Sequence, residues 1–304
     1  MKLSTICLSS CSGCHLTLLH LHDMFLNLLS STQLVFSPLL MDIKEPQECD
    51  IAIVEGGIRN EEDIEKITTL RAKTITLIAM GTCAVYGGVA GLGNSFNHRE
   101  FLQSIYPVQS EGKRPRLVPR FMPIDSAVVV DYYIPGCPPP PEVIETFVQS
   151  ILKGESPKLN NLPVCAECPR VVRGEFSPEM KRTFENRINP EECLLQQGFV
   201  CMGSVTRAGC GGVCTSAGTP CIGCRGPSHR VILEATHGIY EDWVRRRCHY
   251  LGLSEKEVEH HLKNIKHNFY SFSLSMPFMR QRKTERVAEL LYRVNWDTEV
   301  SHGT

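Results

Sequence analysis

Cysteine is the residue type that most constrains this sequence. The chain has 15 cysteines in 304 residues, and eight of them fall between Cys165 and Cys224, where an even distribution would place about three. Cysteine at this density either forms the disulfide framework of a small secreted domain or ligates metal in a reducing compartment. The chain is long, and its first residues, MKLSTICLSSCSGC, resemble no export signal. We therefore expect metal ligation and a cytoplasmic location.

Composition excludes two classes of partner. With 32 Lys+Arg against 33 Asp+Glu, the chain has a net charge of -1 and lacks the surplus positive charge that binds nucleic acid. The longest apolar stretch, residues 16–40, is interrupted by polar residues such as His20, Asp23 and Asn27. It does not form about twenty continuous lipid-facing residues. We expect neither a nucleic-acid partner nor a membrane span.

Strands and helices alternate over the first half of the chain. Apolar segments predict strands at residues 3–8, 34–36, 50–54, 74–79 and 127–133. Apolar side chains spaced three and four apart predict helices over about residues 15–30, 60–73 and 142–153. This order predicts an α/β fold with an open, doubly wound parallel sheet covered by helices on both faces. Such sheets bind ligands at the carboxyl ends of their strands.

Four cysteines follow three of these predicted strands. Cys11 and Cys14 come after the first strand, Cys83 after residues 74–79 and Cys137 after residues 127–133. Because the carboxyl ends of parallel strands meet at one edge of a sheet, the four thiols can converge there and suit an iron-sulfur cluster. The alternative is that Cys83 and Cys137 are packing residues, since free cysteine is often buried. Their combination with a C-x2-C turn favours ligation.

The second group of cysteines follows a proline- and asparagine-rich linker that begins near residue 156. Its eight members make two sets of four. Glycine and proline surround them, so we expect little regular secondary structure and a fold that depends on metal-thiolate bonds. Two zinc sites would use the same C-x2-C pairs. A third all-thiolate site on the sheet favours a chain of iron-sulfur clusters instead.

These motifs resemble those of the small subunits of nickel-iron hydrogenases over roughly residues 3–230. The family binds its proximal 4Fe-4S cluster through C-x-G-C, G-T-C-A-x-x-G-G and P-G-C-P-P motifs, which stand here at residues 11–14, 81–88 and 135–139. The resemblance implies that the proximal ligands are Cys11, Cys14, Cys83 and Cys137. We expect a flavodoxin-like domain over residues 1–155, an irregular, ferredoxin-like iron-sulfur domain over 156–230 and a helical C-terminal extension over 231–304.

The resemblance also divides the eight later cysteines into two ligand sets. The distal 4Fe-4S cluster would be bound by Cys165, Cys168, Cys193 and Cys201, with cysteine where periplasmic members carry histidine. The medial cluster would be bound by Cys210, Cys214, Cys221 and Cys224, and four ligands imply 4Fe-4S. Three all-cysteine clusters resemble the cytoplasmic members, above all the F420-non-reducing hydrogenases that work with heterodisulfide reductase. The F420-reducing and NAD(P)-linked hydrogenases are the alternatives.

By this resemblance the chain is an electron relay, and the nickel-iron centre that activates H2 lies in a separate large subunit. Electrons would leave to an acceptor, either a 2Fe-2S delta subunit with heterodisulfide reductase or a flavin subunit. Two alternatives are a cluster subunit of a quinone reductase, which shares the first domain, and a zinc-stabilised interaction module.

Four further residues need an interpretation. Many family members carry glutamate after the second proximal cysteine, where this sequence has His15. We expect His15 to be either a proton relay or a solvated residue in the first turn of a helix. Cys7, Cys49 and Cys248 lie outside the three sets and are expected to be ordinary thiols.

Overall fold

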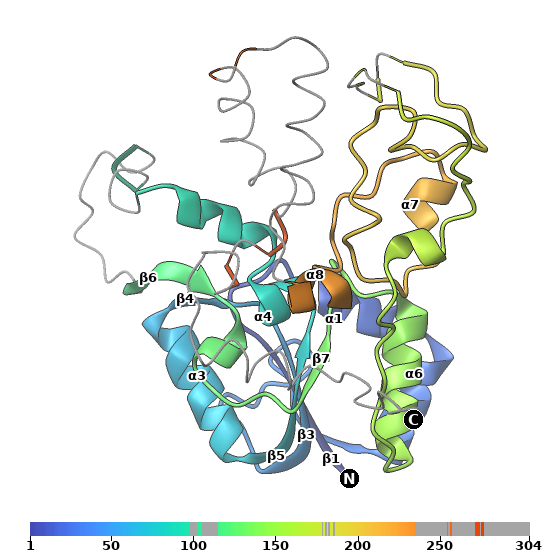
Figure 1. Cartoon of the computed structure of the whole chain (residues 1–304). Coiled ribbons are helices and arrows are strands. Elements are labelled where there is room, and N and C mark those ends of the chain that lie inside the picture. The colour runs from blue at the N-terminus through green and yellow to red at the C-terminus, as the bar shows by residue number, and fades with distance from the viewer. Residues whose placement is uncertain are drawn as a thin grey trace, which may run out of the picture. The chain divides into compact units, whose positions relative to one another are not determined.

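The computed structural model describes residues 1–97, 102–104, 115–177, 179, 181, 183–184, 186–234, 254, 256, 271–273 and 275–276. These residues form two compact units (Figure 1). The first contains residues 1–159 and the described residues from Phe272 onward, and the second contains the described residues between Asn160 and Ser271. Most of the predicted extension over 231–304 lies outside the described residues, and the three-part division remains a prediction.

The first unit is built on a five-stranded parallel sheet. Its strands are β1 (Lys2–Cys7), β2 (Gln33–Phe36), β3 (Cys49–Glu55), β5 (Thr74–Met80) and β7 (Tyr132–Ile134). They lie in the order β2-β1-β3-β5-β7. This is the flavodoxin-like doubly wound order, whose direction reverses between β1 and β3. The predicted α/β fold is confirmed.

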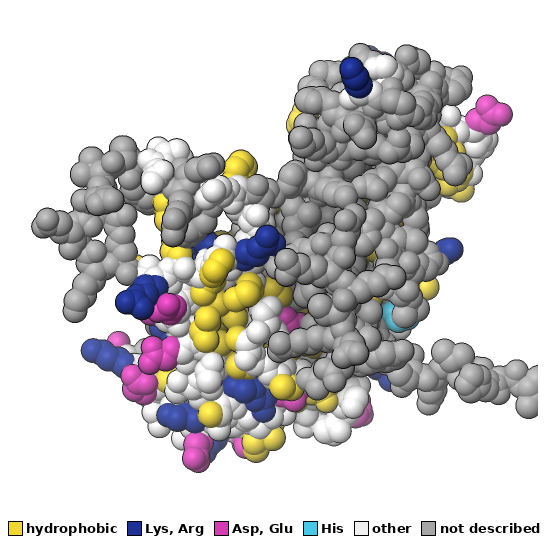
Figure 2. All heavy atoms as spheres, turned by 60° about the vertical axis from the view of Figure 1, so that its left-hand side comes forward, with side chains coloured by type: hydrophobic (Ala, Val, Ile, Leu, Met, Phe, Trp, Pro, Cys, Tyr) yellow, Lys and Arg dark blue, Asp and Glu magenta, His cyan; other side chains and the backbone are white. Residues whose placement is uncertain are grey.

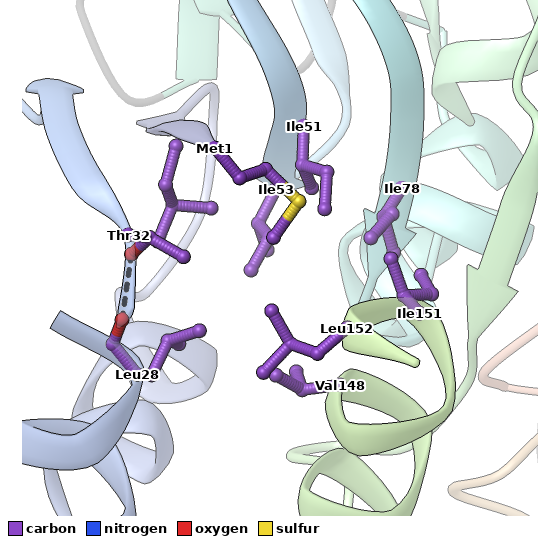
Figure 3. Close-up of a pocket in the computed structure, with 10 residues that line it drawn as sticks. Met1, Leu28, Thr32, Ile51, Ile53, Ile78, Val148, Ile151 and Leu152 are labelled. Atoms are coloured by element: carbon purple, nitrogen blue, oxygen red, sulfur yellow. Dashed lines mark hydrogen bonds between the residues drawn. The ribbon is translucent and has the colours of Figure 1, made fainter. Parts of the chain in front are cut away.

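Helices cover both faces of this sheet, which explains why its central strands are almost wholly apolar. Figure 1 shows α3 (Glu61–Ala72) on one side of the sheet and α6 (Pro141–Leu152) on the other. Figure 3 shows how side chains of α6 and of α2 (Asp23–Ser31) point toward the strands around a cavity of about 10 Å³. A volume this small holds at most one water molecule. The cavity is a packing defect of the core.

Helix α3 begins where the sequence predicts a helix start. The Asn60 side chain accepts a hydrogen bond from Asp63 N–H at 2.8 Å, and Asp63 Oδ2 accepts one from Asn60 N–H at 3.2 Å. This reciprocal capping box satisfies two backbone donors that the first turn of a helix leaves without partners. Ile67 and Leu70 are fully buried on the inner face of the helix.

The structure corrects the single helix predicted over residues 15–30. Two helices are present, α1 (Gly13–Leu19) and α2, separated by a turn in which His22 has φ of 48°. A residue with this backbone conformation cannot continue a right-handed helix. Leu18 and Leu28 are both buried. The apolar stripe therefore continues across the break, and periodicity could not reveal it.

The strand predicted at residues 127–133 is shorter than expected. Ile124–Ser126 forms a 3-10 turn, and Val128 N–H still donates to Ile124 O at 3.2 Å. Pairing with β5 begins only at Asp131, whose N–H donates to Leu77 O at 3.0 Å and whose carboxylate accepts from Leu77 N–H at 2.7 Å. The turn and this carboxylate replace the first half of the predicted strand.

Further short elements extend the first unit beyond the prediction. Strands β4 (Ile58–Asn60) and β6 (Leu117–Met122) form an antiparallel pair, and α4 (Thr82–Tyr86) follows β5 directly. A 3-10 helix, η1 (Val89–Ser95), comes next. The Asn94 side chain joins it to β6, because it accepts from Phe121 N–H at 2.7 Å and donates to Phe121 O at 2.9 Å.

The second unit has little regular structure, as its glycine and proline content predicts. It contains η3 (Val164–Ala166), α7 (Val213–Ser216) and α8 (His229–Glu234), joined by loops and isolated bridges. Phe199 and Ala208 are buried in it, and so are two arginines, Arg207 and Arg225, at 0% and 2% exposure. Buried guanidinium groups are rare, because removing a charge from water is costly.

Two further observations concern membrane spans and surface charge. No helix in the described part of the chain is long and apolar enough to cross a membrane. Acidic and basic side chains are mixed among the described side chains of the face in Figure 2. This mixture agrees with the nearly neutral net charge.

Candidate metal sites

The first candidate site lies at the carboxyl ends of β1, β5 and β7, where the loops carry Cys11, Cys14, Cys83 and Cys137. Burial raises the pKa of the Cys14 thiol, and the charges of Glu55 and of the other three cysteines raise it further. Burial and the charges of Cys137 and Cys11 likewise raise the pKa of Cys83 to about 12. The structure therefore brings these four thiols together. As thiolates they repel one another, and a positively charged metal would relieve that repulsion.

Backbone hydrogen bonds join the two loops that carry Cys83 and Cys137. Gly81 N–H donates to Ile134 O at 2.8 Å, and Thr82 N–H donates to Gly136 O at 2.8 Å. In return, Gly136 N–H donates to Thr82 Oγ1 at 2.9 Å. The positions of Cys83 and Cys137 are thus fixed relative to each other by the ends of β5 and β7.

Two glycines keep space free beside the thiols of this site. Gly81 has φ of 89°, and a Cβ there would overlap Cys14 Sγ. Gly88 has φ of 55°, and a Cβ there would lie 2.5 Å from Cys83 Sγ. Both positions combine a left-handed backbone with close approach to a thiol, which only glycine allows. The two glycines therefore leave room for the sulfur atoms of Cys14 and Cys83.

A buried polar network lies beside these thiols, at the point where the strand order reverses. Glu55, at the end of β3, is 1% exposed and accepts hydrogen bonds from His15 N–H at 2.8 Å, Cys7 Sγ at 2.9 Å and Ser10 Oγ at 2.8 Å. His15 Nδ1 lies 3.2 Å from Glu55 Oε2. Burial alone would raise the pKa of the Glu55 carboxyl, but the hydrogen bonds from His15 and Cys7 and the charge of His15 lower it to about 2.

This network changes the interpretation of two residues. His15 is 6% exposed, so it is not a solvated helix residue. Cys7 is more than an ordinary thiol, because it contacts Glu55 and lies 3.2 Å from His15 Nδ1. Burial and then Glu55 raise the pKa of Cys7 to about 12, so the thiol stays protonated. A sequence signal existed, because the charged Glu55 directly follows the apolar run of residues 51–54.

Cys49 and Cys248 are the other two cysteines outside the three sets. Cys49 is buried, and its Sγ lies 3.3 Å from Thr74 Oγ1, as expected for a packed thiol. Cys248 lies outside the described residues.

The second candidate site gathers Cys165, Cys168, Cys193 and Cys201. Burial and then the charges of the other three raise the pKa of Cys165 to about 12. All four line one cavity of about 40 Å³, together with apolar residues that include Val164 and Leu194. The structure thus groups the set predicted for the distal cluster.

The third set is only partly grouped by direct interactions. Cys221 and Cys224 lie close enough for the charge of Cys224 to contribute to the raised pKa of Cys221, although burial is the largest cause. Cys221 N–H also donates to Cys201 Sγ at 3.3 Å, so the second and third sets meet there. Cys214 lies on α7, and Cys210 lies on the loop before it. Their grouping with Cys221 and Cys224 remains a prediction.

The spacing of these sulfurs can be compared with the spacing around a single zinc ion. Zinc holds its four thiolates at about 2.3 Å, which places the sulfurs about 3.8 Å from one another. Among the described residues, Cys7, His15 and Glu55 are the only three potential ligands whose atoms all lie within 4.8 Å of one another. The twelve cysteines of the three sets are all described, and no three of them are as close.

Comparisons with known proteins agree with this arrangement. The family model described as "NADH ubiquinone oxidoreductase, 20 Kd subunit" matches residues 11–151. A subunit of the F420-non-reducing hydrogenase vhu of Methanocaldococcus jannaschii is 45% identical over 239 residues, which cover 76% of this chain and 83% of that protein. The corresponding subunit of the F420-non-reducing hydrogenase of Methanothermobacter marburgensis is 35% identical over 302 residues, covering 90% and 94%.

A solved structure shows the same fold. The actinobacterial-type NiFe-hydrogenase from Ralstonia eutropha H16 superposes with a TM-score of 0.51 at 17% identity, covering 74% of this chain and 79% of that chain. The family model ends before the second unit begins, whereas the relatives from Methanocaldococcus and Methanothermobacter cover three quarters or more of the chain. On this identity and coverage, the chain belongs to the family of hydrogenase small subunits that includes these two subunits of F420-non-reducing hydrogenases.

Proposed function

We propose that this chain is the electron-transfer small subunit of a nickel-iron hydrogenase and relays electrons from H2 oxidation through three 4Fe-4S clusters. The observation that carries the proposal is the convergence of Cys11, Cys14, Cys83 and Cys137 from three strand ends at the switch point of the sheet. Ligands of doubly wound sheets bind at this point. Membership in the hydrogenase family supports the assignment.

The three cysteine sets are the proposed ligands. Bound 4Fe-4S clusters supply one-electron transfer. The chain itself contributes four thiolates to each, in the sets Cys11, Cys14, Cys83 and Cys137 (proximal), Cys210, Cys214, Cys221 and Cys224 (medial), and Cys165, Cys168, Cys193 and Cys201 (distal). The contact between Cys201 and Cys221 supports adjacent positions for the last two.

The partners follow from this role. A large subunit would hold the nickel-iron centre and activate H2, and the loops around Cys11 and Cys83 would dock to it. We place the electron acceptor in the direction of heterodisulfide reductase, reached through a 2Fe-2S delta subunit. The names of the relatives describe hydrogenases that do not reduce F420, which favours this choice over an F420-reducing complex. A flavin-bearing subunit is the second candidate, because the delta subunit of the NAD-reducing hydrogenase of Cupriavidus necator is 35% identical over 51% of this chain.

The proposed location is the cytoplasm. All fourteen described cysteines are free thiols. A reducing compartment keeps thiols in this form, which cluster ligation requires.

His15 is the proposed proton relay of this subunit. The ring of His15 lies against Glu55 and Cys7. In the chain, His15 directly follows the proposed ligand Cys14 on α1. Imidazole exchanges protons near neutral pH. In His15→Ala, we expect the pH profile of hydrogen uptake between pH 6 and 8 to change. An unchanged profile in the assembled complex would show that His15 has only a structural role.

The decisive experiment is the metal content of the chain purified anaerobically with its partners. We expect about twelve iron and twelve labile sulfide per chain, the stoichiometry of three four-iron clusters. Cys83→Ser should lower both by about four, whereas the matched control Cys49→Ser replaces a packed thiol and should lower neither. A co-purifying nickel-containing large subunit would identify the complex. Zinc without labile sulfide would contradict the proposal and favour a structural interaction module.

A further inference from the structure

Glu167 lies within the first C-x2-C pair of the second unit, yet its side chain contacts a different loop. Its Oε1 accepts a hydrogen bond from Gly209 N–H at 2.7 Å. Its Oε2 accepts from Cys210 N–H at 3.1 Å and from Gly211 N–H at 2.9 Å. One carboxylate thus binds three consecutive backbone N–H groups of the loop that carries Cys210.

The conformation of this loop explains how a single carboxylate can reach all three donors. Gly209 and Gly211 have φ of 106° and 63°. Glycines in such conformations let successive N–H groups point the same way and form a concave anion-binding nest. Here the anion is a side chain of the protein itself. Asn160 Nδ2 also donates to Glu167 Oε1, at 3.3 Å, and helps to orient the carboxylate.

A buried arginine holds the same loop from another side. Arg225 is 2% exposed, and its Nε donates to Ala208 O at 3.0 Å. Its guanidinium lies against Gly209, where an added Cβ would be 2.9 Å from Nη2. Arg225 directly follows Cys224. The loop that carries Cys210 is therefore held by a neighbour of Cys224 and by a residue located between Cys165 and Cys168.

We infer that Glu167 is a positioning residue that fixes Cys210 and lowers the reduction potential of the cluster bound there, an inference that rests on the proposed function. Two physical effects act in the same direction. A negative charge beside an anionic cluster favours its oxidised form. Hydrogen bonds to cluster sulfur raise the potential, and N–H groups that are engaged by Glu167 are withheld from sulfur.

The test is an anaerobic redox titration of the assembled hydrogenase, monitored by electron paramagnetic resonance, with Glu167→Gln. Glutamine has no charge, and its amide places an NH2 donor where one carboxylate oxygen stood, so at least one of the three N–H groups loses its acceptor. We expect the ratio of reduced to oxidised form of one cluster to rise about tenfold at a fixed potential, which corresponds to 59 mV for a one-electron couple. The proximal cluster, whose proposed ligands lie in the first unit, should titrate as in the wild type.

Two further variants make the result specific. Glu167→Asp keeps the charge on a shorter side chain and should restore part of the wild-type potential. Glu191→Gln is the matched control, because Glu191 is an exposed carboxylate of the same unit that pairs with Arg173 at 3.1 Å. All three clusters should titrate normally in this variant.

Each outcome of the titration either supports or overturns the proposed role of Glu167. Loss of about four iron from the Glu167→Gln variant alone, with the other two signals intact, would also support the positioning of Cys210. Unchanged potentials, an equal shift in Glu191→Gln, or loss of iron from all three sites would overturn the inference. If the wild-type complex contains no iron-sulfur cluster, the proposed function fails before the variant is measured.

Discussion

The two units hold their cysteines in different ways. In the first unit, the thiols follow parallel strands whose central residues are fully buried, such as Val54 and Ala79. In the second unit, most of the cysteines lie in loops, which are joined by hydrogen bonds of polar side chains such as Glu167 and Arg170. Arg170 donates to Thr215 O at 2.6 Å and to Glu192 O at 3.1 Å, next to Cys214 and Cys193.

The first site is positioned by an apolar core, whereas metal binding in the second unit would itself contribute to the stability of the fold. The apolar core of the first unit provides its stability through burial, about 25 cal/mol for each Å² of apolar surface. The second unit buries two guanidinium groups among few regular elements. Metal-thiolate bonds can supply the folding free energy that such a unit lacks. We therefore expect the first unit to fold without metal and the second unit to require it.

Iron removal should have the largest effect and tests this comparison directly. We expect anaerobic chelation of iron to leave backbone amides of β3 and β5 protected from hydrogen exchange, while amides of residues 193–228 exchange quickly. Mass spectrometry of peptides from both units in one sample provides the internal control. Equal protection in the two units after chelation would show that the second unit is stable on its own.

Replacement of Glu55 should have a smaller effect on stability than iron removal, because Glu55 belongs to the unit that we expect to fold without metal. The pKa of Glu55 is lowered from 4.5 to about 2, which corresponds to about 3 kcal/mol of stability. We expect Glu55→Gln to lower the free energy of unfolding of the first unit by about this amount at pH 7, measured by urea denaturation.

The same measurement has a pH dependence with a defined sign. A carboxyl whose pKa is depressed in the folded state stabilises the protein above its unfolded pKa, and this contribution is lost as the pH falls through the folded value. The difference between wild type and Glu55→Gln should therefore be fully present just above pH 4.5 and shrink as the pH falls toward 2. A difference that persists at the lowest pH would assign the effect to packing instead of charge.

The smallest effect concerns a local feature of the first unit, the start of α3. Asn60→Ala removes one half of the capping box of α3 and should cost about 1 kcal/mol in the free energy of unfolding. The iron content should not change, because the core still positions the strand ends. Loss of iron in this variant would show that the first site depends on local stability as strongly as the second unit does.

The sequence predicted features that depend on local chemistry. The start of α3 at Asn60 and the apolar strand Thr74–Met80 were found because capping residues and buried strands have their own patterns. The three cysteine sets came from thiol spacing together with the family resemblance, and their roles as ligands remain predictions. The break at His22 was missed, since its cause is one backbone dihedral angle within a continuous apolar stripe.

Contacts between distant segments could not be predicted in this way. Cys7 and Glu55 are partners because β1 and β3 pair in a register that places them opposite each other. Asp131 shortens a predicted strand because its carboxylate binds a neighbouring strand. The attachment of Glu167 to Gly209 joins loops 42 residues apart. These interactions depend on the tertiary fold, so a one-dimensional pattern does not contain them.

The order of strands in the sheet also determines when the first proposed site can form during synthesis of the chain. Cys11 and Cys137 belong to one proposed site, but 126 residues separate them in the chain. At roughly 5–20 residues per second of synthesis, the last thiol leaves the ribosome on the order of ten seconds after the first. During this interval, Cys11 and Cys14 are present without the partners that complete the site. Cluster delivery must therefore follow synthesis of the strand β7, and the early thiols need a reducing environment until then.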